Sequence, residues 1–203
     1  MSQSSSCPFK GNICRRPICP RSGCGFQTLM NLVNRYRQNY SRADHRVMNS
    51  LLNVLQSRWN SSLSGAAASR AMGAAFERFV RQSLGQQTRQ LGKRVRIRRG
   101  SRKNNVQLLG ISYIPDITVH DANTGRLRTL IEVKIYAQTS DVLAIMALAA
   151  FQGAKVALVT FHPPSNKLRS ALQQMMNQWQ GKFRYFCFVQ SPSSTLNQLA
   201  GFV

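Results

Sequence analysis

Carboxylates are scarce in this basic chain, so each one is a candidate for chemistry. The sequence holds 6 acidic residues against 28 lysines and arginines, and the six are Asp44, Glu77, Asp116, Asp121, Glu132 and Asp141. Asp116 follows a proline, and Glu132 precedes Lys134 by two positions. Two carboxylates beside a lysine suit metal-assisted hydrolysis of a phosphodiester, because Mg²⁺ prefers oxygen ligands and an ammonium group can orient water or neutralise charge on the phosphate. The pattern therefore predicts a site at Asp116, Glu132 and Lys134.

The residues around Glu132 read as a strand with one apolar face. Between residues 126 and 136, the odd positions 127, 131, 133 and 135 are apolar. Since side chains alternate along a strand, Glu132 and Lys134 are expected side by side on the opposite face. Two carboxylates together with the backbone carbonyl of Val133 are oxygen ligands that suit Mg²⁺. An exposed strand face carrying an ordinary acid and lysine is the simpler alternative.

The register of the preceding strand decides whether Asp116 joins this face. The segment 121–125, Asp-Ala-Asn-Thr-Gly, has a composition typical of hairpin turns. If it forms a five-residue connection, His120 pairs with Arg126, and Asp116 faces the same way as Glu132 at a diagonal of about 7 to 8 Å. A shift of register by one residue would separate the two carboxylates.

The elements that must position these residues follow from apolar periodicity. Helices are predicted over residues 26–40, 41–59, 66–84, 140–152 and 167–179, and strands over 106–114, 116–120, 126–136, 154–161 and 183–189. Ser41, with Asp44 in capping-box spacing, and Ser165 are expected as helix caps. This order predicts an α/β fold with a Cys-rich segment (1–25), a helical hairpin (26–64), a core that carries the candidate site (65–190) and a weakly ordered C-terminal tail (191–203).

The motif resembles the signature of the PD-(D/E)xK nuclease superfamily. Pro115-Asp116, fifteen intervening residues and Glu132-Val133-Lys134 carry the resemblance, which extends over residues 66–190. It implies a restriction-endonuclease-like α-β-β-β-α-β core, with a mixed central sheet flanked by helices. It also implies that Asp116 and Glu132 bind Mg²⁺ or Mn²⁺ and that Lys134 is catalytic.

The resemblance adds further candidate residues. The first core helix of the superfamily often supplies a glutamate, and Glu77 is the matching residue, with a helix-surface pair to Arg81 as its alternative. Some such families add a glutamine after the Glu-x-Lys, and Gln138 and Gln152 are both candidates for it. Residues 147–175 are similar to restriction-endonuclease-like toxin domains of bacterial polymorphic toxins.

The formal net charge of +22 makes nucleic acid the expected partner, because a basic surface binds polyanions through counterion release. Residues 93–103 are expected to contact phosphates through Lys93, Arg94, Arg96, Arg98, Arg99, Arg102 and Lys103, and their alternating apolar residues could join a sheet edge. A solvated basic loop is the alternative. DNA is favoured over RNA, because most aromatic residues fall on apolar stripes. No run of about 18 apolar residues is present, so no membrane role is expected.

Four of the five cysteines lie near the N-terminus, at Cys7, Cys14, Cys19 and Cys24. Their spacing departs from the C-x2-C pairs of most zinc modules, so a structural Zn²⁺ site, disulfides and free thiols all remain open, with zinc slightly favoured. The fifth, Cys187, lies in an apolar strand and is expected to be core packing. The first residues lack the apolar core of a signal peptide, which predicts action in a cytoplasm, with export by a dedicated secretion system as an alternative.

The sequence thus predicts a metal-dependent endonuclease that hydrolyses DNA. An antibacterial toxin, with an acidic immunity protein as its inhibitor, and a phage or mobile-element nuclease are two biological roles that fit it. A homodimer is an open alternative to a monomer. The competing function is a non-catalytic basic protein that binds nucleic acid on a nuclease-like fold.

Overall fold

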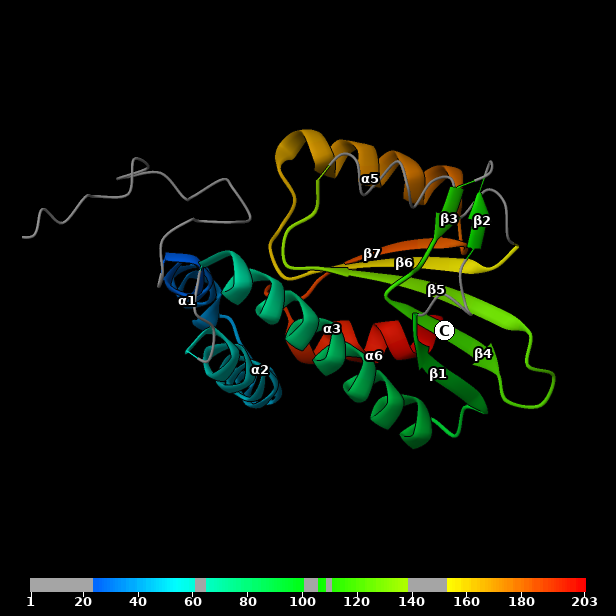
Figure 1. Ribbon diagram of the computed structural model, residues 1–203, viewed down its shortest axis with the longest axis horizontal. Helices are drawn as coiled ribbons and strands as arrows, with labels where there is room; N and C mark the ends of the chain where they lie inside the picture. The colour runs from blue at the N-terminus through cyan, green and yellow to red at the C-terminus, as the bar shows by residue number, and fades with distance from the viewer. Residues whose placement is uncertain (1–23, 61–64, 101–105, 109–110, 139–152) are drawn as a thin grey trace, which may run out of the picture.

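Residues 24–60, 65–100, 106–108, 111–138 and 153–203 are described by the structure, a computed structural model (Figure 1). The helices in these ranges are α1 (Cys24–Arg37), α2 (Arg42–Asn60), α3 (Gly65–Gln90), α5 (Asn166–Gln178) and α6 (Pro192–Phe202). The strands are β1 (Val95–Arg99), β2 (Val106–Leu108), β3 (Ile111–Tyr113), β4 (Ile117–Asp121), β5 (Leu127–Lys134), β6 (Lys155–Thr160) and β7 (Phe183–Cys187). The predicted α/β class is confirmed, and the helix predicted over 140–152 lies outside the described residues.

The central sheet has the strand order β1-β4-β5-β6-β7. β4 runs antiparallel to both β1 and β5, whereas β6 runs parallel to both β5 and β7, so the sheet is mixed. In β6, residues 156–160 are all buried, because a parallel strand inside a sheet is covered on both faces. The basic segment after α3 joins the sheet as its edge strand, β1.

The segment 106–114, predicted as one strand, forms two short strands instead. β2 and β3 pair antiparallel with each other, from Val106 with Tyr113 to Leu108 with Ile111, in a sheet separate from the central one. The prediction was wrong because it treats the nearly alternating pattern of residues 106–114 as one strand and does not treat Gly110 in its middle as a break. In Figure 1 this pair lies on the same side of the central sheet as α5, and Tyr113 packs against the apolar cluster beneath α5.

Helices cover both faces of the central sheet (Figure 1). On one face lie α3 and α6, with α2 packed against both of them and α1 against α2, and there the ring of Phe76 from α3 meets Phe161 and Phe188 edge to face. On the other face α5 packs with its buried leucines and methionine, and its predicted cap Ser165 is confirmed. β5 contributes to both cores, since Ile131 belongs to the first cluster and Leu130 to the second. No helix in the described ranges is both long enough and apolar enough to cross a membrane.

The segment 191–203 is mostly helix α6 rather than the weakly ordered tail that was predicted. Pro192 stands in its first turn, where the missing N–H has no helical partner to lose. Leu196, Leu199 and Phe202 are buried, and the helix packs against α2, α3 and β7. The prediction was wrong because serine and proline at a helix start resemble the composition of a loop.

Asp44 joins the starts of α2 and α6. One of its carboxylate oxygens accepts hydrogen bonds from the backbone N–H and the hydroxyl of Ser193, at 2.8 and 2.6 Å. The other accepts from the N–H and hydroxyl of Ser41, at 3.1 and 2.6 Å, while the Ser41 hydroxyl oxygen accepts from the N–H of Asp44. The predicted capping box is therefore confirmed, and the same carboxylate also holds a second helix.

Candidate active site

The three residues of the predicted site meet where β4 begins and β5 ends. Ile117 of β4 pairs with Ile131 of β5, so the next residues outward, Asp116 and Glu132, stand opposite each other. Directly opposed residues have Cβ atoms about 4.5 to 5.5 Å apart, closer than a diagonal pair. Lys134 lies two residues beyond Glu132 on the same face.

The register of this hairpin differs from the predicted one. His120 pairs with Leu127 rather than with Arg126, and an irregularity between Val119 and His120 shifts the pairing again. At Ile117 the combined displacement is two residues, since its partner is residue 131 where the predicted register gave residue 129. Because side chains alternate with a period of two, a displacement of two residues keeps Asp116 and Glu132 on one face, as predicted. Leu127 was predicted on the face of Ile131 but packs beneath α5 instead, because the irregularity in the pairing lies between them.

Backbone groups hold Asp116 from two sides. Its Oδ2 accepts a hydrogen bond from the N–H of Val133 at 2.8 Å, and its carbonyl oxygen accepts one from the N–H of Gly100 at 2.9 Å. Gly100 has no room for a side chain, because a Cβ there would lie 1.6 Å from the carbonyl oxygen of Pro115. The end of β1 therefore holds the Pro-Asp pair through a close backbone contact that glycine permits.

Lys134 bridges the two carboxylates. Its Nζ lies 3.7 Å from Asp116 Oδ2 and forms a close ion pair with Glu132 Oε1. The side chain of Glu132 is only 6% exposed, whereas that of Lys134 is 32% exposed and so reaches solvent. The second oxygen, Glu132 Oε2, is buried and has no hydrogen-bond partner among the described residues.

Burial raises the pKa of both carboxyl groups. For Glu132, the loss of hydration is the largest cause and the charge of Asp116 adds to it, while the charge of Lys134 and hydrogen bonds from Lys134 and Tyr113 lower the pKa. For Asp116, burial is again the largest cause, Lys134 lowers the pKa, and the charge of Glu77 raises it. A buried carboxyl group beside a partly exposed one, with the charge of Asp116 disfavouring ionisation of Glu132, forms a site that favours added positive charge.

The donor atoms fit a hard divalent cation. A buried carboxylate oxygen without a partner is costly, and a bound cation would remove that cost at Glu132 Oε2. In a strand the N–H and C=O of one residue point to the same side, so the Val133 carbonyl also faces β4 and Asp116. Mg²⁺ takes few protein ligands and retains several waters. Among the described residues, no three His, Cys, Asp or Glu side chains come close enough together to hold a metal between them.

Glu77 lies on α3 within electrostatic range of Asp116. Its Oε1 is 3.4 Å from Arg99 Nε, at the end of β1, and its side chain is 14% exposed. The alternative pair with Arg81 is not formed, since the carboxylate turns to Arg99 and the buried Arg81 Nε has no hydrogen-bond partner within the described ranges. The structure thus brings Glu77 to the edge of the site, in an ion pair.

The arginines of β1 divide between the two faces of the sheet. Val95 and Ile97 pack against the core beside α3, so Arg96 and Arg98 point to the opposite face, which also carries Glu132. Arg94, Arg96, Arg98 and Arg99 are all exposed, and Arg102 and Lys103 lie outside the described residues.

Lys93 differs from its neighbours in the basic stretch. Its Nζ donates hydrogen bonds to the carbonyl oxygens of Gly201 and Val203, at 2.9 and 2.7 Å, at the end of α6. A lysine at this position offsets the negative end of the helix dipole. Lys93 therefore ties α6 to the chain segment before β1, a contact that the sequence pattern did not predict.

Several other predicted residues can be placed briefly. Gln138 is exposed just beyond β5, and Gln152 lies outside the described residues. Cys7, Cys14 and Cys19 and the side chain of Cys24 also lie outside the described part of the chain. Cys187 is buried and free, so its prediction as a core residue is confirmed.

Two residues at the site escaped prediction. Tyr113 reaches Glu132 from the separate β2–β3 sheet, and Gly100 supports Asp116 from β1. Tyr113 lies two residues before Pro115, so its nearness to the motif was a signal that could have been used. Comparison of the chain with models of protein families, with curated proteins and with solved structures gave no match.

Proposed function

We propose that this chain is a Mg²⁺-dependent endonuclease that hydrolyses DNA phosphodiester bonds at Asp116, Glu132 and Lys134. The observation that carries the proposal is the geometry of the two opposed carboxylates. They share one lysine at the end of a strand pair, and the buried Oε2 of Glu132 has no hydrogen-bond partner within the described part of the chain. Structural ion pairs seldom leave a buried carboxylate oxygen without a hydrogen bond. A metal site, in contrast, needs a carboxylate oxygen that is free to bind the ion.

Each residue has a distinct role in this proposal. Asp116 and Glu132 hold the cation, with the Val133 carbonyl and water completing its ligands, and Mn²⁺ would bind the same oxygen donors. The bound cation supplies Lewis-acid stabilisation of the phosphate and a lowered pKa for an attacking water. Lys134, partly exposed, is placed to orient that water or to neutralise charge on the phosphate.

The arrangement of the elements supports a restriction-endonuclease-like core. α3 precedes the antiparallel strands β1, β4 and β5, and β6, α5 and β7 follow them as a parallel unit. The carboxylates lie at the start of β4 and in β5, the middle strands of that order, and Glu77 on the preceding helix lies within electrostatic range of Asp116. This agreement of element order with motif position supports the family resemblance, and with it the assignment of Glu77 as a further metal ligand.

Net charge supports DNA as the substrate, because Arg96 and Arg98 share the sheet face of Glu132 and the whole chain carries +22. The same charge makes an acidic protein a fitting inhibitor, as a toxin role would require. An acidic protein that blocks cleavage would support the toxin role, whereas selective cutting of branched DNA would support a phage or mobile-element nuclease.

Cleavage of a supercoiled plasmid tests the proposal. With Mg²⁺ the wild-type protein should convert the supercoiled form to nicked or linear DNA, and a chelator should stop the conversion. Glu132→Gln and Lys134→Met should each lower the rate at least about a hundredfold. Lys182→Met, which removes an exposed lysine before β7, should cut at the wild-type rate. Salt-sensitive binding without cleavage by the wild-type protein would instead establish the non-catalytic function.

A further inference from the structure

A basic pocket lies at the opposite end of β5 from the candidate active site. Its volume is about 490 Å³, and its lining includes Thr124, Arg126, Arg128, Thr129, Lys155 and Val203. Thr129 precedes Lys134 by five residues in β5, which corresponds to about 16 Å along a strand. The pocket is therefore separate from the carboxylates on the same strand.

An irregularity in β5 brings Arg128 and Thr129 to the same face of the sheet. The pairing with β4 passes from Thr129 directly to Leu127, which leaves Arg128 without a partner in that ladder. Leu127 and Leu130 both pack in the cluster beneath α5, so the two residues between them face the other way, as in a β-bulge. The bulge thus places a guanidinium group beside a hydroxyl group.

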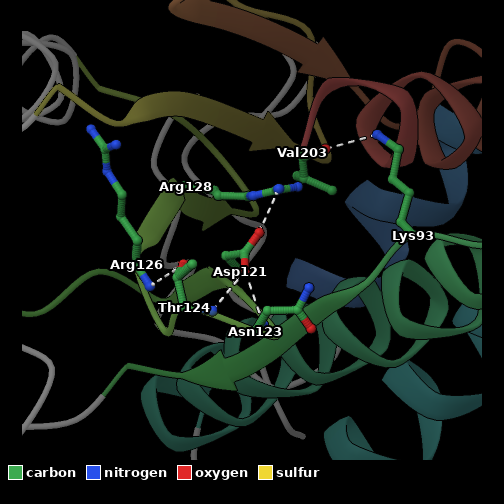
Figure 2. Close-up of polar contacts among 7 residues, drawn as sticks. All are labelled: Lys93, Asp121, Asn123, Thr124, Arg126, Arg128 and Val203. Atoms are coloured by element: carbon green, nitrogen blue, oxygen red, sulfur yellow. Dashed lines mark hydrogen bonds and ion pairs between the residues drawn. The ribbon is translucent and has the colours of Figure 1, made fainter.

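Positive charges outnumber negative charges around this pocket. Arg128 pairs with Asp121 at 2.6 Å and lies between Asp121 and Val203 in Figure 2. Lys155 and Lys93 donate to carbonyl oxygens at the end of α6, while the Arg126 side chain is exposed. Burial first, and then the charges of Lys155 and Arg128, lower the pKa of Lys93, so these cations act on one another.

Thr129 makes this pocket more than a group of surface cations. Its side chain is fully buried and lines the pocket, yet its hydroxyl has no hydrogen-bond partner among the described residues. Valine has the same shape and would occupy this position without a polar group to satisfy. The hydroxyl is explained if it donates to a ligand.

We propose that this pocket binds a phosphate group, with Arg126 and Arg128 opposing its charge and the Thr129 hydroxyl donating to one of its oxygens. Guanidinium groups match phosphate geometry, and the volume leaves room for an attached sugar. The phosphate could belong to a DNA backbone or to a small phosphate ester. For DNA, about 16 Å corresponds to roughly five base-pair steps from the candidate active site. Only that DNA version rests on the proposed function.

Binding measurements in a chelating buffer test the pocket without any need for cleavage. Calorimetry would give the affinity for inorganic phosphate, and fluorescence anisotropy would give the affinity for a short DNA duplex as a function of salt. The variants are Arg128→Gln, Arg126→Gln and Thr129→Val. Arg169→Gln, an exposed arginine on α5, is the control for the loss of one surface charge.

Arg128→Gln and Arg126→Gln should weaken phosphate binding about tenfold, and Thr129→Val severalfold without any change in charge. Thr129→Val should keep the wild-type melting temperature, because the hydroxyl bonds to nothing within the described chain. If the bound phosphate belongs to DNA, Arg128→Gln should lower the slope of the logarithm of DNA affinity against the logarithm of salt concentration by about one. An unchanged slope with weaker phosphate binding would identify a small ester. Phosphate binding that is unaffected by Thr129→Val, or equally affected by Arg169→Gln, would overturn the proposal.

Discussion

Asp116 Oδ2 accepts a hydrogen bond of 2.8 Å from the backbone N–H of Val133, the residue between Glu132 and Lys134. The Pro-Asp part of the motif is thus hydrogen-bonded to the middle residue of the Glu-Val-Lys part, across the β4–β5 pair. The bond fixes the direction of the Asp116 carboxylate, and it turns the Val133 carbonyl toward the same space. The spacing of the two halves in the sequence is therefore a consequence of hairpin register.

Asp116→Asn should abolish cleavage without unfolding the protein. The amide oxygen of asparagine can still accept the Val133 N–H, but it supplies no charge for a cation, so we expect at least about a hundredfold loss of rate. Burial raises the pKa of Asp116, so its ionised form costs stability above that pKa, and the neutral amide removes the cost. The melting temperature in chelator should therefore stay level or rise.

The matched control for this variant is Asp121→Asn, at the other end of β4. Asparagine there can still accept the N–H groups of residues 123 and 124 in the turn. Mg²⁺ should raise the melting temperature of the wild-type protein and of the control, but not of Asp116→Asn, because only a protein that binds the ion is stabilised by it. Equal stabilisation of all three proteins by Mg²⁺ would contradict the assignment of Asp116 as a ligand.

Glu77 is tested by comparison with its ion-pair partner. If Glu77 binds the cation, Glu77→Gln should raise the Mg²⁺ concentration needed for half-maximal cleavage by about tenfold or more. Arg99→Gln should have little effect on this concentration, because the Arg99 side chain is 66% exposed and its pair contributes little. If the two variants change the Mg²⁺ requirement equally, Glu77 only forms the ion pair with Arg99 and is not a metal ligand.

Asp44→Asn should destabilise the protein in a pH-dependent way. Burial raises the pKa of Asp44, but hydrogen bonds from Ser193 and Ser41 outweigh it, and the folded pKa lies below its usual value. The stability gained is thus fully present above the unfolded pKa of about 3.9 and lost as the pH falls through the folded pKa. In urea unfolding, the variant should lose about 2 kcal/mol at neutral pH, and the loss should shrink below about pH 4.

The variants Ser41→Ala and Ser193→Ala measure separately how much the hydrogen bonds to each carboxylate oxygen of Asp44 contribute to stability. Each removes a hydroxyl that donates to one carboxylate oxygen while leaving the backbone N–H in place, so each should cost about 1 kcal/mol. A loss for Asp44→Asn that stays constant from neutral pH to about pH 2 would show that the charge of Asp44 does not hold the two helices.

Much of the candidate site could be predicted from local sequence, because the face on which each side chain of a strand lies follows from the order of polar and apolar residues along it. Glu132 and Lys134 lie on the predicted face, and Asp116 joins them even though the register was wrong, since the displacement of two residues preserves the faces. One residue of this displacement comes from the turn and one from the irregularity between Val119 and His120, and the strand pattern contains neither.

The features that could not be predicted are contacts between segments far apart in the chain. Lys93 lies in a charged run that reads as a phosphate-binding surface, but its ammonium bonds to carbonyl groups 108 and 110 residues later. The support of Asp116 by Gly100 likewise depends on the pairing of β1 with β4. α6 is different, because Leu196 and Leu199 follow a helical spacing that was visible in the sequence.

Gly100→Ala should damage the site more than the fold. The added methyl group would meet the Pro115 carbonyl oxygen, and backbone cannot move aside as a flexible side chain can. We therefore expect the end of β1 to separate from the start of β4, at a cost of about 1 to 3 kcal/mol. The Gly100 N–H would no longer hold Asp116, and cleavage at limiting Mg²⁺ should fall by about tenfold or more.

The control for this variant is Gly73→Ala, within α3, where an added Cβ meets nothing within 4 Å. Alanine is the better helix former, so this variant should gain about 0.5 to 1 kcal/mol in urea unfolding and cut DNA at the wild-type rate. Saturating Mg²⁺ should restore part of the activity of Gly100→Ala, because binding energy can pull a displaced ligand back into place. If Gly100→Ala keeps the wild-type Mg²⁺ requirement, the contact between β1 and Pro115 does not position Asp116.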